Sequence, residues 1–129
     1  MNKIYKYDIY ERIFKFVIEV LKLLDRVSFS YSNQIFKNQL IRSVTSMGAN
    51  SQEADGAFTT KDFLHCFVLV RKEGKETSYW LKVIKETNPS LSQELEVLIG
   101  ESTEIVAIVS KIVKNARTNS SFMFSSIGH

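Results

Sequence analysis

The sequence predicts an all-α protein, an antiparallel up-down-up-down four-helix bundle formed by residues 1–117. The chain has 129 residues, 44% of them hydrophobic, which is enough for one domain with a core and too few for two. It has one proline and five glycines, so it lacks the frequent turns that a sheet protein needs. Apolar residues recur at spacings of three and four through four long segments, as they do in amphipathic helices.

The first predicted helix spans about residues 8–28. Its apolar stripe is formed by Ile9, Ile13, Phe16, Val20, Leu24 and Val27. Packing on a single core needs an apolar arc of about 100° or a little more. Six further residues widen the apolar surface to well over half of the circumference: Tyr10, Phe14, Val17, Ile18, Leu21 and Leu23.

The second and third predicted helices span about residues 33–55 and 60–87. A serine or asparagine caps the start of the second, which ends before Gly56. A threonine caps the start of the third, which ends at Asn88-Pro89 because proline cannot continue a helix and restricts the residue before it.

The fourth predicted helix spans about residues 90–117 and opens with a capping box in which Ser90 and Gln93 satisfy each other's backbone amides. Residues 118–129 show no helical period and are predicted to form a flexible tail.

The first and last helices carry more apolar surface than one core covers, since Ile105–Val109 is apolar all round. We expect further copies of the chain to cover the surplus, in a homo-oligomer. Alternatively, tail residues such as Phe122 and Phe124 cover it.

The composition predicts a soluble cytoplasmic protein. The single cysteine, Cys66, lies among apolar residues and has no partner for an intrachain disulfide, which favours a buried thiol in a reducing compartment. Charged residues interrupt the N-terminal stretch as they do not in a signal peptide, and no run of about 18 apolar residues occurs.

Catalysis is not expected. Asp62 and His65 have the i, i+3 spacing used in di-iron helical bundles, but such a site needs a second pair and two more carboxylates. The other histidine, His129, ends the chain. No phosphate-binding glycine loop, nucleophile elbow or zinc spacing is present, so we expect no metal and no cofactor.

The third predicted helix places Glu73 at the edge of its apolar face, beside Trp80 and one turn before Glu76. A carboxylate there is costly to bury unless a cation meets it, and Arg42, of the same chain or of a neighbouring subunit, is the candidate. Alternatively, both glutamates reach water.

Two segments of the sequence resemble a known family. Arg42-Ser43, Ser46-Met47-Gly48-Ala49-Asn50, Glu53 and Gly56 look like the R-[AS]-x-x-S-[IV]-x-x-N-[IV]-x-E-G signature of the bacterial four-helix bundle protein family. Arg71–Leu81 is similar to that family's R-K-E-A-x-E-T-x-Y-W-L segment, with Gly74 in place of alanine, and Ser51 replaces the isoleucine after Asn50.

The resemblance implies a homopentameric ring. The family includes proteins encoded in intervening sequences of large-subunit ribosomal RNA genes. One relative is the accessory variability protein of diversity-generating retroelements, a basic pentamer that works with a reverse transcriptase and nucleic acid. The residues that carry the motif, and that we expect to act in assembly, are Arg42, Ser46, Asn50, Glu53, Glu73, Glu76 and Trp80.

Basic residues form one stripe on each of two predicted helices, although the net charge is only +3. Phosphate binding strengthens with the number of phosphates neutralised, so a ring would multiply each stripe. The candidate nucleic-acid-binding residues are Arg12, Lys15, Lys22 and Arg26 on the first helix and Arg71, Lys75, Lys82 and Lys85 on the third. Alternatively, because Asp8, Glu11 and Glu19 adjoin or interrupt the first stripe, it is a solvated face of mixed charge.

Two functions follow from these observations. The first is a non-enzymatic accessory protein that assembles as a ring and binds RNA or DNA, a nucleic-acid enzyme, or both. The second is a protein-interaction scaffold without nucleic-acid binding.

Overall fold

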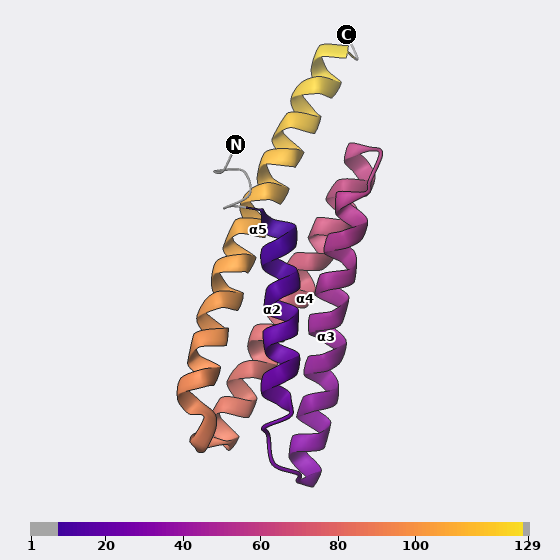
Figure 1. Cartoon of the computed structure of the whole chain (residues 1–129). Coiled ribbons are helices and arrows are strands. Elements are labelled where there is room, and N and C mark those ends of the chain that lie inside the picture. Colours follow the sequence, from indigo (N-terminus) through magenta and orange to yellow (C-terminus); the bar gives the residue numbers. More distant parts are fainter. Residues whose placement is uncertain (1–7, 128–129) are drawn as a thin grey trace.

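The computed structural model describes residues 8–127, and the side chains of residues 8–119. Four long helices lie side by side in a helical bundle (Figure 1). They are α2 (Ile9–Leu24), α3 (Tyr31–Asp55), α4 (Thr60–Thr87) and α5 (Ser92–Ile127), with a short 3₁₀ turn, η1 (Pro89–Leu91), before α5. The described part of the chain contains no strand, so the predicted all-α class is confirmed.

Side-chain caps set the start of three helices. The Asp8 carboxylate accepts hydrogen bonds from the Tyr10 and Glu11 amides, at 3.0 and 3.3 Å, at the start of α2. Ser30 accepts from the Asn33 amide at the start of α3, and Thr59 accepts from the Asp62 amide at the start of α4. These bonds satisfy backbone donors that have no partner within the helix.

Helix α2 ends at Leu24, earlier than the predicted residue 28. The Arg26 and Val27 amides bond to the carbonyls of Leu23 and Leu24, at 2.9 and 3.2 Å, so the chain tightens into a last 3₁₀-type turn. The backbone is extended at Ser30, with φ of −157°, and there it caps α3, which therefore starts before the predicted residue 33.

The last helix differs from the prediction at both ends. At its start, Pro89–Leu91 form η1 in place of the Ser90–Gln93 capping box, and α5 begins at Ser92. At its end, α5 continues to Ile127, through most of the segment predicted as a flexible tail. No glycine or proline lies between residue 117 and Gly128, so nothing in this stretch breaks the helix. The side chains of Phe122 and Phe124 lie outside those described.

The core lies along the shared axis of the four helices. Helix α4 packs along both α3 and α5, and α2 contacts α3 and α5. Every helix contributes fully buried apolar side chains, among them Ile13, Phe16 and Val20 from α2, Leu40, Val44 and Met47 from α3, Phe67, Val70, Leu81 and Ile84 from α4, and Leu95, Ile105 and Val109 from α5. Burial of about 25 cal/mol per Å² of such surface is the main force holding the bundle together.

Two glycines allow helices to approach closely. A Cβ at Gly74 would lie 2.8 Å from Val106 Cγ2, and one at Gly48 would lie 3.1 Å from Val17 Cγ2. The absence of a side chain at Gly74 therefore lets α5 pack closely against α4, and its absence at Gly48 lets α2 pack closely against α3. Helix α3 continues through Gly48 without interruption.

An asparagine pair ties one end of the bundle together. The side-chain amides of Asn33 and Asn88 bond to each other in both directions, at 2.9 and 3.0 Å, and each also donates to a carbonyl, of Ser28 and Ile84. The connections at 25–30 and 88–91 meet at this end, and that at 56–59 lies at the other, where the last turns of α5 extend past the bundle (Figure 1).

Candidate functional site

Arg42 joins α3 to α4 through two carboxylates. Its guanidinium pairs with Glu73, at 3.3 Å, and with Glu76. The Glu73 side chain is only 12% exposed, so a cation beside it offsets much of its desolvation cost. Glu73 therefore meets the candidate cation, and the Arg42 that pairs with it belongs to the same chain.

The hydrogen bond from Arg42 also lowers the pKa of the Glu76 carboxyl, against the raising effect of burial. Glu76 in turn accepts a hydrogen bond of 3.2 Å from Trp80 Nε1. The charged pair and the indole thus form one connected polar cluster across the α3–α4 seam, which we call the motif cluster: Arg42, Glu73, Glu76 and Trp80.

Aromatic rings extend the motif cluster outward. Trp80 stacks on Phe36 of α3, with ring centroids 6.2 Å apart. The Trp80 ring also meets Tyr79 edge to face, at 4.9 Å and an interplanar angle of 76°, a favourable geometry for aromatic pairs. Tyr79 remains 58% exposed, so one side of its ring faces solvent.

The other three motif residues lie apart from this cluster. Asn50 donates to the carbonyl and hydroxyl of Ser46, one turn earlier on α3, at 2.9 and 3.3 Å. Glu53 is exposed, and within the described residues it makes no ion pair. The motif residues therefore have three different roles. The motif cluster joins α3 to α4, Asn50 and Ser46 bond to each other within α3, and the Glu53 carboxylate makes no ion pair with a described residue.

Acidic residues of α5 engage the basic stripe on α2. Arg12 makes a bidentate contact with Glu101, both bonds 2.8 Å long, and a further contact of 2.9 Å with Glu104. Arg26 pairs with Glu94 at 2.9 Å. Only Lys15 and Lys22 of the predicted stripe are exposed and free of ion pairs with the described residues, so two of its four positive charges are already paired within the chain.

The basic stripe on α4 is largely free. Lys85 pairs with Glu96 of α5 at 2.9 Å. Arg71, Lys75 and Lys82 make no ion pair with any described residue. Spacings of four, seven and three residues keep all four on one side of the helix, and the Lys85–Glu96 contact places that side along α5.

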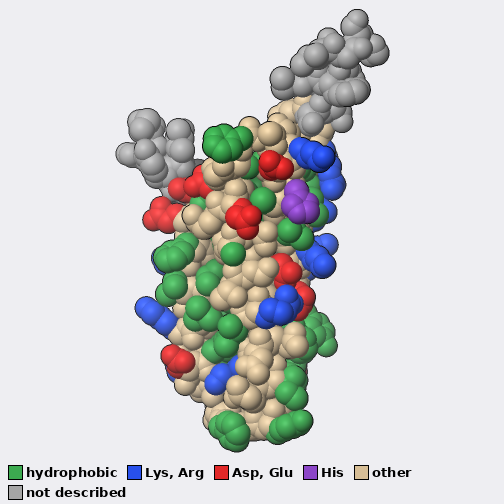
Figure 2. All heavy atoms as spheres, turned by 90° about the vertical axis from the view of Figure 1, so that its right-hand side faces the viewer, with side chains coloured by type: hydrophobic (Ala, Val, Ile, Leu, Met, Phe, Trp, Pro, Cys, Tyr) green, Lys and Arg blue, Asp and Glu red, His purple; other side chains and the backbone are tan. Residues whose placement is uncertain are grey.

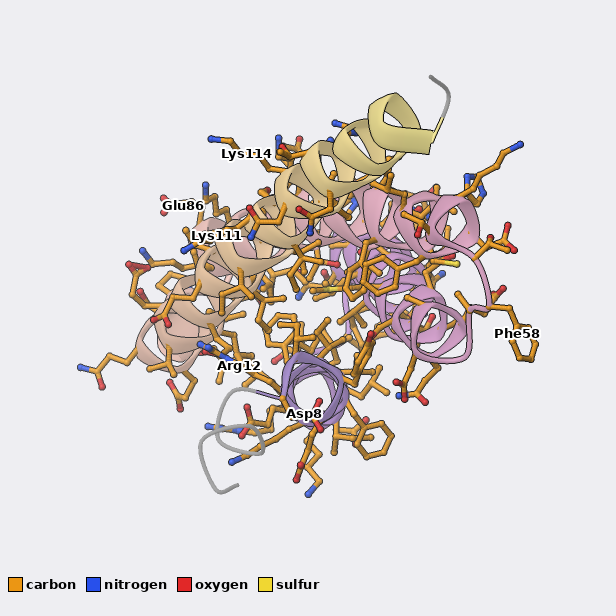
Figure 3. All side chains as sticks on the ribbon, turned by 90° about the horizontal axis from the view of Figure 1, so that it is seen from above. Asp8, Arg12, Phe58, Glu86, Lys111 and Lys114 are labelled. Atoms are coloured by element: carbon orange, nitrogen blue, oxygen red, sulfur yellow. The ribbon has the colours of Figure 1, made fainter. Side chains whose placement is uncertain are left out.

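Two lysines of α5 extend this stripe. Gly74 lies opposite Val106, Ser78 bonds to Ser102 and Lys85 to Glu96, so α4 and α5 run in opposite directions at this contact. Lys114 lies 18 residues, or five full turns, after Glu96, so the two residues are on the same side of α5. Lys111 lies one turn before Lys114. Lys111 and Lys114 project from α5 on the side away from α2 (Figure 3).

We call this set the α4–α5 basic face: Arg71, Lys75, Lys82, Lys111 and Lys114. Given how α4 and α5 are aligned, the basic face extends for about 24 Å along the helix axes, from Lys114 to Lys82, at 1.5 Å per residue. Lys111 and Lys114 were missed from the sequence, although their i, i+3 spacing was visible, because the pairing of α4 with α5 decides which flank they share. Glu86 of α4 also projects to this side, so the face is not purely basic (Figure 3).

A second surface, on the α2–α3 seam, is apolar around Phe14 and mixed in character toward its other end, where Lys22, Asp25, Gln34 and Lys37 lie among apolar residues. Two shallow hollows line it, of about 250 and 530 Å³. Phe14, 60% exposed, lies beside Tyr10 and Val17 in the first, and Ile18 and Leu21 lie in the second. Figure 2 shows hydrophobic side chains from the top to the bottom of one face, with Lys, Arg, Asp and Glu side chains among them and several Lys and Arg side chains along its upper right edge.

The apolar surplus predicted for the last helix is mostly covered within the chain. Ile105 and Val109 are fully buried and Val106 and Ile108 are half-buried, although Val97 is 71% exposed. The large exposed apolar side chains that remain on the described helices are Phe14 on α2, Tyr31, Ile35 and Ile41 on α3, Tyr79 on α4 and Val97 on α5.

Cys66 and His65 show no sign of a catalytic or metal-binding role in the described residues. Cys66 is buried, and burial raises the pKa of its thiol, which disfavours the reactive thiolate. His65 is exposed. Among residues 8–127, no three His, Cys, Asp or Glu side chains lie close enough to hold a metal ion, and no helix is long and apolar enough to cross a membrane.

Four packed helices define a helical-bundle protein. Its described surface has a charged bridge on the α3–α4 seam and a row of cations without ion-pair partners among the described residues along α4 and α5. The chain belongs to the family described as 23S rRNA-intervening sequence protein, which matches residues 5–111. The resemblance seen in its motifs is thereby confirmed.

A similar solved structure supports the same assignment. It is the crystal structure of a protein of unknown function from the S23 ribosomal protein family, from Bacteroides thetaiotaomicron VPI-5482. The two chains are 28% identical, with a TM-score of 0.74, and the similarity covers 82% of this chain and 95% of that one. No curated protein matches the chain.

Proposed function

We propose that this chain is a non-enzymatic accessory protein that assembles with copies of itself into a ring and binds RNA or DNA through the α4–α5 basic face. The observation that carries the proposal is the row of five cations, none of which has a carboxylate partner among the described residues. Cations that make no internal pair are available to replace the counterions of nucleic-acid phosphates.

The basic residues of α2 are less suitable for binding phosphates than those of α4 and α5. There, Glu94, Glu101 and Glu104 occupy the arginines that a phosphate would need. We therefore move the proposed interface from both predicted stripes to α4 and α5. The family description, which refers to an intervening sequence of 23S rRNA, supports a role near RNA.

The α2–α3 seam supports the assembly part of the proposal. An up-down-up-down bundle that exposes Phe14 beside an apolar hollow is stabilised when another copy covers it. The homopentamer is the arrangement that the family resemblance implies. Light scattering should give a mass several times the 14.8 kDa of one chain, and a single-chain mass at all concentrations would remove the ring.

Salt dependence tests the nucleic-acid part. Affinity for a labelled RNA or DNA should fall steeply between roughly 50 and 200 mM salt, because each bound phosphate releases a counterion. The double variant Lys111→Ala/Lys114→Ala should reduce the slope of log affinity against log salt by about 0.7 to 0.9 for each phosphate that the variant no longer neutralises.

The matched control is Lys15→Ala/Lys22→Ala on α2, which removes the same charge from the other predicted stripe. It should leave the slope nearly unchanged. If both double variants reduced the salt slope equally, the nucleic acid would be attracted by the net charge of the protein as a whole. That result would contradict binding at the α4–α5 basic face.

The runner-up is a protein-interaction scaffold without nucleic-acid binding, in which the motif cluster fixes the subunit arrangement and the α2–α3 seam receives a partner such as a reverse transcriptase. The exposed Phe14 favours it, since an aromatic anchor in an apolar hollow is typical of protein interfaces. Assembly without any salt-sensitive nucleic-acid binding would select this alternative.

A further inference from the structure

Tyr79 occupies an unusual position on the surface of α4. Its ring is 58% exposed. Lys75 lies one turn before it and Lys82 one turn after it, at helix spacings of four and three that place all three on neighbouring rows. Along the axis the two lysines are about 6 and 4.5 Å from the tyrosine, at 1.5 Å per residue. An exposed aromatic ring is thus interleaved with two cations that make no ion pair with the described residues.

The motif cluster holds this ring in place. Arg42 bonds to Glu76, Glu76 accepts from the Trp80 indole, and Phe36 stacks on Trp80. Trp80 then presents its ring to Tyr79 in an edge-to-face contact of 4.9 Å. Tyr79 therefore reaches solvent from a supported position, and Trp80 is a positioning residue for it.

Unpaired nucleobases bind to such arrangements. Every base has a flat face that stacks on an aromatic side chain, and basic residues beside the ring hold the backbone phosphates. In a duplex the bases are stacked on one another and are not available to a surface ring. Glu76, one turn before Tyr79, already pairs with the Arg42 guanidinium, and Glu86 lies two turns after Tyr79 on the same helix.

We propose that Tyr79 is a stacking platform for an unpaired nucleobase, with Lys75 and Lys82 holding the adjacent phosphates, so that the basic face selects single-stranded over double-stranded nucleic acid. This proposal rests on the nucleic-acid function proposed above and names its substrate class. It also gives Trp80, which supports the Tyr79 ring, a role beyond packing.

The test compares binding of a labelled oligouridylate and of an RNA duplex of the same length to the full chain. Tyr79→Ala should weaken binding of the single strand by at least about fivefold, the lower end for loss of one stacked base. The salt slope should stay as it is, since the variant keeps every cation that meets a phosphate, and duplex binding should not change.

Two variants separate stacking from other roles of this side chain. Tyr79→Phe keeps the ring and should retain the affinity, whereas Tyr79→Leu keeps apolar bulk without a flat ring and should behave like Tyr79→Ala. The matched control is Phe58→Ala, which removes a fully exposed ring that points to the opposite side from Lys111 and Lys114 (Figure 3). It should bind both probes like the parent.

Three outcomes would overturn the proposal. One is single-strand affinity unchanged in Tyr79→Ala while Lys111→Ala/Lys114→Ala still lowers the salt slope, which refutes stacking and leaves the proposed function standing. Another is a changed mass of Tyr79→Ala in light scattering, which would make the residue a subunit contact. The third is the absence of any binding by the parent protein, which refutes the function and the platform together.

Discussion

Ser51 is a polar residue in a fully buried position of α3. Its side chain is 1% exposed, and its hydroxyl has no hydrogen-bond partner among the described residues. The family pattern places isoleucine here, so the substitution noted in the sequence falls on the core rather than on the surface. The buried hydroxyl of Ser43, eight residues earlier on α3, by contrast accepts a 3.0 Å hydrogen bond from Thr77.

We predict that Ser51→Ala stabilises the protein, because it removes a buried hydroxyl whose unmet hydrogen bond costs about 1–3 kcal/mol. Urea unfolding should show a higher midpoint with an unchanged m-value. Ser43→Ala is the control and should destabilise, since it leaves Thr77 without its partner. A lower midpoint for Ser51→Ala would show that the hydroxyl is satisfied in solution.

Sequence reasoning reached one charged contact at this scale and missed another. Glu73 could be assigned a cationic partner because a carboxylate on an apolar edge demands one, and Arg42 is the nearest arginine on the adjacent helix. The pairing of Arg12 with Glu101 and Glu104 could not be predicted, since it depends on which side of α2 turns toward α5.

At the scale of the helices, Gly74 sets the distance between α4 and α5. The alanine usual in the family would place its Cβ 2.8 Å from Val106 Cγ2, and a β-branched side chain has little freedom to move away. At Gly100, on α5, an added Cβ would meet nothing within 4 Å. The two glycines therefore respond differently to the same substitution.

Gly74→Ala should destabilise by about 1–3 kcal/mol through overpacking, partly offset by helix propensity. Gly100→Ala should stabilise by up to about 1 kcal/mol, since it gains propensity without a clash. Thermal unfolding of both variants checks this, and the double variant Gly74→Ala/Val106→Ala should recover much of the loss. A stabilised Gly74→Ala would mean that α5 shifts freely along α4.

The α2–α5 contact gives a pH dependence. The hydrogen bond from Arg12 lowers the pKa of the Glu101 carboxyl from its ordinary value of 4.5, against the effect of burial. The folded pKa lies below the unfolded one, so this stabilisation is present above the unfolded pKa and is lost as the pH falls through the folded pKa.

Glu101→Gln should therefore lose about 0.5–1 kcal/mol of stability at pH 7 and show a shallower decline of unfolding free energy in acid. The control, Glu104→Gln, leaves the bidentate Arg12–Glu101 contact intact and should change little, because the Glu104 side chain is 69% exposed. Unfolding measured from neutral pH down to below 4.5 tests this, and parallel curves for parent and Glu101→Gln would contradict it.

Local signals defined helix boundaries unevenly. Helix α4 has the predicted bounds, because a threonine cap and Asn88-Pro89 mark them in the sequence. The end of α5 was not predictable by the same means: its serine-rich last turns lack an apolar period, yet no residue before Gly128 interrupts a helix that is already formed.

At the scale of the molecule, the surface patches of this bundle depend on which helices are neighbours. The helix periodicity was sufficient to predict the fold class, but the basic face required knowledge of which helices are neighbours. Lys75 and Lys111 come from elements far apart in the sequence, and only the packing of α4 on α5 makes them one surface. The same packing leaves apolar side chains of both α2 and α3 exposed along their seam, among them Phe14 and Ile41.

Photochemical crosslinking of a 5-iodouridine-substituted single-stranded RNA, followed by peptide mapping, tests most directly whether nucleic acid lies on the α4–α5 basic face. The account predicts crosslinks within residues 71–82 of α4, with Tyr79 foremost because aromatic rings stacked on the base react best. Crosslinks confined to α2, or none under conditions where a known RNA-binding protein gives them, would contradict it.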